Sequence, residues 1–151
     1  MQLVLVQHGE AVSKEQDPNR PLTDAGRRDV DALATFLGRA EAVPATVWHS
    51  GKPRARQTAE TLSVGNAAEA RGGLGPQDDV DALAGELAER WSDLMIVGHQ
   101  PFLGRLASRL LTGTSDGLAV AFEPGSALAL ARGEAGWALA WMVRPGLISR
   151  S

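Results

Sequence analysis

Two histidines and one arginine are the residues of this sequence that are best suited to chemistry. His8, Arg54 and His99 each follow a short apolar run, at residues 2–7, 46–49 and 94–97 respectively. Such runs are typical of strands that are buried on both faces of a sheet. Because ligands of open α/β sheets bind beyond the carboxyl ends of the strands, we expect the three side chains to meet in one pocket. A histidine held there beside the small Gly9 is suited to act as a nucleophile or a base.

Helical segments alternate with these runs over most of the chain. The first predicted helix begins at Thr23 and ends at Gly38, and the second covers about 50–62. A third is expected from Asp78 or Asp79 to Arg90, and a fourth after Pro101 to about Leu111. A link rich in Gly and Ala is expected up to Gly75–Pro76, and further strands at Leu118–Phe122, Ala127–Ala131 and Trp137–Val143. This alternation predicts an α/β fold, a three-layer sandwich with a mostly parallel central sheet.

Composition argues against several classes of function. A length of 151 residues with 44% hydrophobic content predicts a single domain over residues 1–151. The net charge of -3 gives no basic field for nucleic acid, and the absence of cysteine excludes disulfides, thiolate metal sites and a cysteine nucleophile. No charged leader with an apolar core and no membrane-spanning apolar run is found, so we expect a soluble, cytoplasmic protein that does not bind membranes.

Four stretches of the sequence match the motifs of a known family in order and extend over most of the chain. The stretches are Gln7–Ala11, Arg20–Gly26, Ser50–Ala59 and Val97–Pro101. Together they resemble the histidine phosphatase superfamily, and more narrowly its small bacterial phosphohistidine phosphatases of the SixA type. The resemblance implies a phosphoglycerate-mutase-like fold and a single histidine phosphatase-like domain.

The resemblance also implies roles for individual residues. His8 would attack phosphorus and become phosphorylated, and water would then release phosphate, while His99 and Arg54 hold the phosphoryl oxygens. The implied phosphate-binding residues are Gln7, Gly9, Arg20, Arg54 and His99. Independently of the family, phosphoryl transfer is catalysed mainly by positioning and by charge around the equatorial oxygens, which a guanidinium in the first turn of a helix can supply. No cofactor is expected, because the histidines lack the spacing of a metal site; His49 is predicted to be a structural or rim residue.

Three departures from the family pattern bear on activity. Gln7 stands where the family has arginine, which predicts weaker binding of a dianionic phosphoryl group. Ser50–Gly51 stands where family members often have Ser-Pro, with Pro53 two positions later. Larger members carry a glutamate acid after the second motif helix, and Glu69 is only a weak counterpart.

The missing acid bears on the substrate. Expulsion of an alkoxide from a phosphate ester benefits from an acid, whereas a phosphorylated imidazole has a better leaving group. The sequence therefore favours a phosphohistidine phosphatase acting on a phosphorylated protein of the histidine-phosphotransfer type. Two alternatives stay open. One is a small-molecule phosphomonoesterase or mutase, if Glu69 or another carboxylate reaches the pocket. The other is a catalytically weak module that binds phosphate or a phosphoprotein, which Gln7 suggests.

Overall fold

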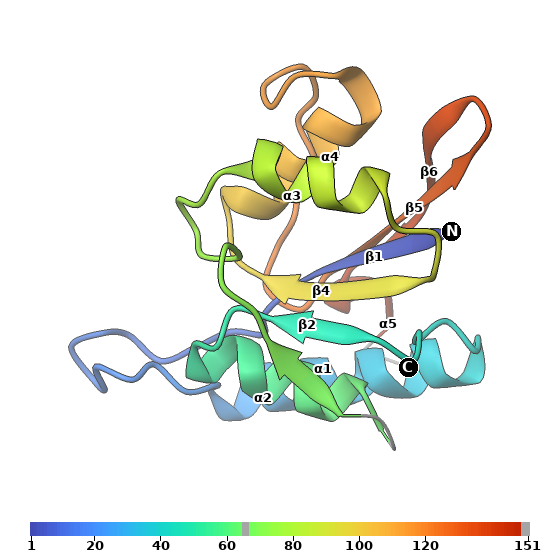
Figure 1. Cartoon of the computed structure of the whole chain (residues 1–151). Coiled ribbons are helices and arrows are strands. Elements are labelled where there is room, and N and C mark those ends of the chain that lie inside the picture. The colour runs from blue at the N-terminus through green and yellow to red at the C-terminus, as the bar shows by residue number, and fades with distance from the viewer. Residues whose placement is uncertain (65–66, 149–151) are drawn as a thin grey trace.

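Six strands form one mixed sheet in the computed structural model, which describes residues 1–64 and 67–148 (Figure 1). The strands lie in the order β3-β2-β4-β1-β5-β6; the first four of these run parallel, β5 pairs antiparallel with β1, and β6 pairs antiparallel with β5. Their bounds are Gln2–Gln7 for β1, Val47–His49 for β2, Ala68–Ala70 for β3, Leu94–Gly98 for β4, Ala127–Gly133 for β5 and Gly136–Val143 for β6. The predicted α/β class with a mostly parallel sheet is confirmed.

Helices cover both faces of the sheet (Figure 1). On one face lie α1 (Asp24–Arg39), α2 (Pro53–Leu62) and the short α5 (Pro145–Ile148), and on the other lie α3 (Val80–Ala88) and α4 (Phe102–Thr112). Alternate residues of each strand point to opposite faces, so β1 contributes to two cores. Leu3 and Leu5 pack with α3 and α4, whereas Val4 and Val6 pack with α1 and α2, and all four are fully buried.

The predicted beginnings of α1 and α3 are confirmed, but the predicted ends are wrong. Thr23 caps α1, because its Oγ1 accepts a hydrogen bond from the Gly26 N–H at 2.9 Å. Gly38 lies inside this helix, since the chain leaves the helical path only at Ala40 and at Glu41, which adopts the left-handed conformation with φ 53°. Asp79 caps α3, and that helix ends at Ala88 rather than Arg90.

The predicted start of α2 near Ser50 is also wrong, for a local reason. Gly51 adopts φ +89° and Lys52 is extended, so neither residue can belong to the helix. Pro53 then opens the helix, where its missing N–H costs nothing. Ser50 is thereby left in a tight turn directly after β2.

Two further predictions fail in the less regular parts of the chain. The link up to Pro76 contains the short strand β3, which pairs with β2. Residues 118–122 form no strand, because β5 already occupies the free side of β1. Val120 and Phe122 instead pack against the core from a loop.

The sheet register fixes which strand ends are neighbours. Gln7 of β1 pairs with Gly98 of β4, and Val97 of β4 pairs with His49 of β2. The residues that follow these three strands therefore lie side by side at the carboxyl edge of the sheet. Among the described residues, no helix combines the length and the apolar character needed to cross a membrane.

Candidate active site

A pocket of about 390 Å³ opens at the carboxyl edge of β1 and β4. It brings together His8, Arg54 and His99, so the predicted convergence is confirmed. The lining residues are Gln7, His8, Glu10, Ala11, Arg20, Arg54, Pro76, His99, Gln100 and Pro124.

His8 is held in the form that a nucleophile requires. Its backbone N–H donates to the Gly98 carbonyl oxygen at 3.0 Å, and its Nδ1 lies 2.7 Å from the Gly9 carbonyl oxygen. Because a carbonyl only accepts, Nδ1 carries the proton and Nε2 keeps its lone pair. Burial lowers the pKa of His8 from 6.5 to about 4. The hydrogen bond to Gly9 acts to raise this pKa, whereas the charges of Arg54 and Arg20 lower it further. The ring is therefore neutral at neutral pH.

His99 lies beside His8, with ring centroids 5.0 Å apart. The Ser50 Oγ is 2.6 Å from the Nε2 of His99, a contact that follows from the neighbouring positions of β2 and β4. Burial lowers the pKa of His99 from 6.5 to about 3, and the neighbouring His8 ring, which would repel a second protonated imidazole, and the Arg54 guanidinium lower it further. Sequence reasoning missed Ser50 as a site residue because it placed Ser50 at the start of a helix and could not see which strands are neighbours.

Arg54 projects from the first turn of α2, as predicted. Burial lowers the pKa of its guanidinium, and the neighbouring Arg20 lowers it further. Thr58, one turn along α2, connects this helix to the backbone next to His8: its Oγ1 donates to the Arg54 carbonyl oxygen at 2.8 Å and accepts from the Gly9 N–H at 3.0 Å. The spacing of Arg54 from His8 is therefore fixed through Thr58.

The structure brings Arg20 to the pocket but not Gly9. Arg20 adopts φ 48°, and its Nε donates to the Val12 carbonyl oxygen at 3.0 Å, which orients the rest of the guanidinium. Gly9 does not line the pocket, and its N–H is already bonded to Thr58. A Cβ at Gly9 would lie 2.7 Å from a methyl group of Val30. This glycine therefore permits close packing against α1, and its predicted part in phosphate binding stays a prediction.

The charges around the pocket differ from the expected set. Gln7 lines it as predicted, with a side-chain Oε1 that is buried and has no hydrogen-bond partner in the described part of the chain. Glu69 lies exposed on β3 and does not line the pocket. The carboxylate that does is Glu10, whose Oε1 accepts from the Thr23 Oγ1 at 3.0 Å. Sequence reasoning missed Glu10, although its place two residues after His8 was a usable signal.

His49 is a structural residue, as predicted. It is buried, and its Nδ1 accepts a hydrogen bond from the Gly51 N–H at 3.0 Å, which supports the turn that holds Ser50. Burial lowers the pKa of His49, and the charge of Glu60 opposes this shift. Within residues 1–64 and 67–148, no group of three or more His, Asp or Glu side chains is arranged to hold a metal ion.

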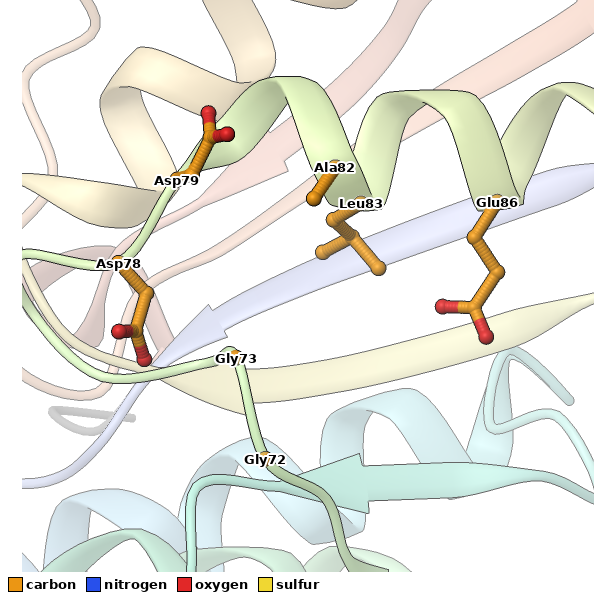
Figure 2. Close-up of a pocket in the computed structure, with 7 residues that line it drawn as sticks. All are labelled: Gly72, Gly73, Asp78, Asp79, Ala82, Leu83 and Glu86. Carbon is orange, nitrogen blue, oxygen red and sulfur yellow. The ribbon is translucent and has the colours of Figure 1, made fainter.

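A second hollow, of about 520 Å³, lies between α3 and the loop at Gly72 and Gly73 (Figure 2). Its carboxylates already have partners within the protein. Asp78 accepts from the Gly75 N–H at 2.7 Å, Asp79 caps α3, and Glu86 pairs with Arg71 at 2.6 Å. We therefore assign the chemistry to the smaller pocket, which contains the neutral histidines and two guanidinium groups.

Comparisons with known proteins indicate the family of the chain. The sequence pattern of the histidine phosphatase superfamily, branch 1, matches residues 3–74. An uncharacterized protein from Picosynechococcus sp. is 33% identical over 124 residues, which cover 75% of this chain and 74% of that protein.

Two solved structures show the same fold. The protein histidine phosphatase SixA complexed with tungstate has a TM-score of 0.84 at 24% identity, covering 97% of this chain and 99% of that one. A protein from Nakamurella multipartitia assigned as the phosphohistidine phosphatase SixA has a TM-score of 0.75 at 26% identity, covering 95% of each chain.

Proposed function

The chain belongs to branch 1 of the histidine phosphatase superfamily, and from that premise we propose that it is a metal-independent phosphatase that acts on phosphohistidine in a protein. The observation that carries the proposal is the state of His8. Its Nδ1 proton is held by the Gly9 carbonyl oxygen, so the lone pair of Nε2 is available beside Arg54 and Arg20.

The reaction proceeds in two balanced steps. The Nε2 lone pair of His8 forms a bond to phosphorus while the bond from phosphorus to the leaving group breaks. Water then attacks phosphorus and the His8–phosphorus bond breaks. Inorganic phosphate leaves with both protons of the water as dihydrogen phosphate, and His8 returns to its neutral form with its Nδ1 proton. Arg54 and Arg20 stabilise the negative charge on the equatorial oxygens during both steps.

The choice of phosphohistidine rests on the leaving group. A phosphorylated imidazole that carries a proton on its other ring nitrogen leaves as neutral imidazole, so it needs no acid from the enzyme. Glu69, the carboxylate that the sequence offered as an acid, lies away from the pocket. The similarity to a protein from Nakamurella multipartitia assigned as a phosphohistidine phosphatase supports the same substrate class. A phosphorylated protein of the histidine-phosphotransfer type is the partner that fits this chemistry.

One observation favours a second candidate, a phosphomonoesterase acting on a small molecule. Glu10 lines the pocket, and its carboxylate is held by Thr23. A carboxyl group in this position can protonate the oxygen of a leaving alcohol. Release of phosphate from an ester would then depend on Glu10, whereas release from phosphohistidine would not.

The test compares hydrolysis of a phosphohistidine peptide and of an aryl phosphate in the presence of a metal chelator. We expect faster turnover of the phosphohistidine peptide, complete loss in His8→Ala, and strong loss in Arg54→Ala. The matched control is Arg56→Ala on the same helix, because Arg56 is exposed, forms an ion pair with Glu60 at 3.8 Å and does not line the pocket. Preference for the ester would favour the second candidate. Anion binding without turnover of either substrate would favour the binding-module alternative.

A further inference from the structure

Unpaired buried polar atoms gather around the active-site pocket. In the described part of the chain, the buried side-chain nitrogen and oxygen atoms without a hydrogen-bond partner are Gln7 Oε1, Arg54 Nε, His99 Nδ1, Gln100 Nε2 and Arg132 Nε. The first four belong to residues that line this pocket. Since buried polar groups are normally paired, this concentration indicates that a polar ligand completes the site.

Gln100 is the member of this set to which neither the family pattern nor the reaction assigns a role. It directly follows His99 and precedes α4. Its Oε1 accepts a hydrogen bond from the Gly104 N–H at 3.1 Å. Because a backbone N–H only donates, this bond fixes the orientation of the amide and identifies the unpaired atom as the Nε2 donor.

We propose that Gln100 is a substrate-binding residue whose Nε2 donates a hydrogen bond to an oxygen of the bound phosphoryl group. This inference rests on the proposed function. It names a further hydrogen-bond donor for the anion in a pocket where Gln7 stands in place of the family arginine. A donor buried without a partner destabilises the free protein, and an anion with several acceptor oxygens removes that penalty when it binds. Because Nε2 is buried, binding requires the Gln100 side chain to move toward the pocket that it lines.

A purely structural role for Gln100 makes a different prediction. In that case the side chain serves only to satisfy the Gly104 N–H at the start of α4, and a carboxylate would do this equally well. Gln100→Glu keeps the acceptor for Gly104 but replaces the donor with a negative charge. Gln100→Met removes both the acceptor and the donor. The two substitutions therefore separate anion binding from helix capping.

The experiment measures tungstate affinity by calorimetry on the full-length protein, together with thermal stability. We expect Gln100→Glu to keep the wild-type melting temperature but to bind tungstate at least tenfold more weakly, and Gln100→Met to show a smaller loss of affinity. Gln77→Glu is the matched control. Gln77 is exposed and follows Pro76, which lines the pocket, so this substitution adds the same negative charge just outside the pocket. Its affinity for tungstate should stay within about twofold of the wild type.

Wild-type affinity in Gln100→Glu, or a loss no larger than that of Gln77→Glu, would overturn the inference. A wild-type protein that binds no tungstate would overturn it as well. Tungstate binding needs no turnover, so the two proposals can fail separately. Binding that depends on Gln100 in a protein that hydrolyses nothing would contradict the proposed function alone, while hydrolysis that is unaffected in both Gln100 variants would contradict this inference alone.

Discussion

Replacement of Gln7 by arginine tests how this pocket holds a phosphoryl group. The charged side chains that line it are Arg20, Arg54 and Glu10, and the pKa values of His8 and His99, at about 4 and about 3, leave both rings neutral at pH 7. A dianionic phosphoryl group therefore faces a lining with one net positive charge. Gln7 adds only an amide, and its unpaired Oε1 is an acceptor that cannot bind a phosphoryl oxygen.

The size of the effect follows from the kinds of hydrogen bond involved. A charge-assisted bond contributes about 1.5–3 kcal/mol and a neutral one about 1 kcal/mol, so the gain is roughly 0.5–2 kcal/mol. About 1.4 kcal/mol corresponds to a factor of ten in rate, and we expect Gln7→Arg to raise kcat/KM by about tenfold. The new cation lies near Arg54 and Arg20, so the melting temperature should fall without anion and recover with phosphate.

The assay is kcat/KM for a phosphohistidine peptide, with Gln7→Met as the control that removes the amide without adding charge. Gln7→Met should lower efficiency by less than Gln7→Arg raises it. If Gln7→Arg is folded but no more efficient than the wild type, the reasoning is refuted, and Arg20 already supplies the cation that the family arginine provides.

Three further predictions concern other residues of the site. Ser50→Ala removes the contact to His99 Nε2, so we expect kcat to fall about tenfold with little change in melting temperature; an unchanged kcat would show that Ser50 does not position His99. Glu10→Gln should slow hydrolysis of an aryl phosphate but leave phosphohistidine hydrolysis within about twofold; equal losses on both substrates would mean that Glu10 acts in binding. Burial lowers the pKa of His99 from 6.5 to about 3 in the folded protein. Below about pH 6.5, His99 therefore binds a proton in the unfolded chain but not in the folded protein. His99 should therefore contribute a loss of stability of about 2 kcal/mol as the pH drops from neutral to about 5, in addition to a loss of the same sign from His8, and His99→Gln should lose that much less than the wild type in urea unfolding.

The residues of the site could be predicted from sequence because short-range patterns determine them. Apolar runs located β1 and β4, and the histidine at the end of each run followed from reading the chain alone. The convergence of His8 and His99 needed one general rule about parallel sheets, which β1 and β4 obey as direct neighbours.

The contacts that orient those residues could not be predicted, because they depend on strand order and turn geometry. The bond from Ser50 to His99 exists only because β2 lies beside β4 and because Gly51 adopts a positive φ. Glu10 rather than Glu69 is the carboxylate that lines the pocket, because β3, which carries Glu69, lies at the edge of the sheet. Local propensity also gave a false strand at residues 118–122, because apolar alternation there serves packing from a loop.

The most direct test of the account is to trap phosphate on His8. The protein is mixed with a phosphohistidine peptide, quenched in alkali within one turnover, digested and analysed by mass spectrometry. The account predicts an acid-labile phosphoryl group on the peptide that contains His8, formed and lost at rates that match turnover, and absent in His8→Ala. Turnover of the substrate with no phosphoryl group on His8 at any time, or with the group on His99 or His49 instead, would contradict it.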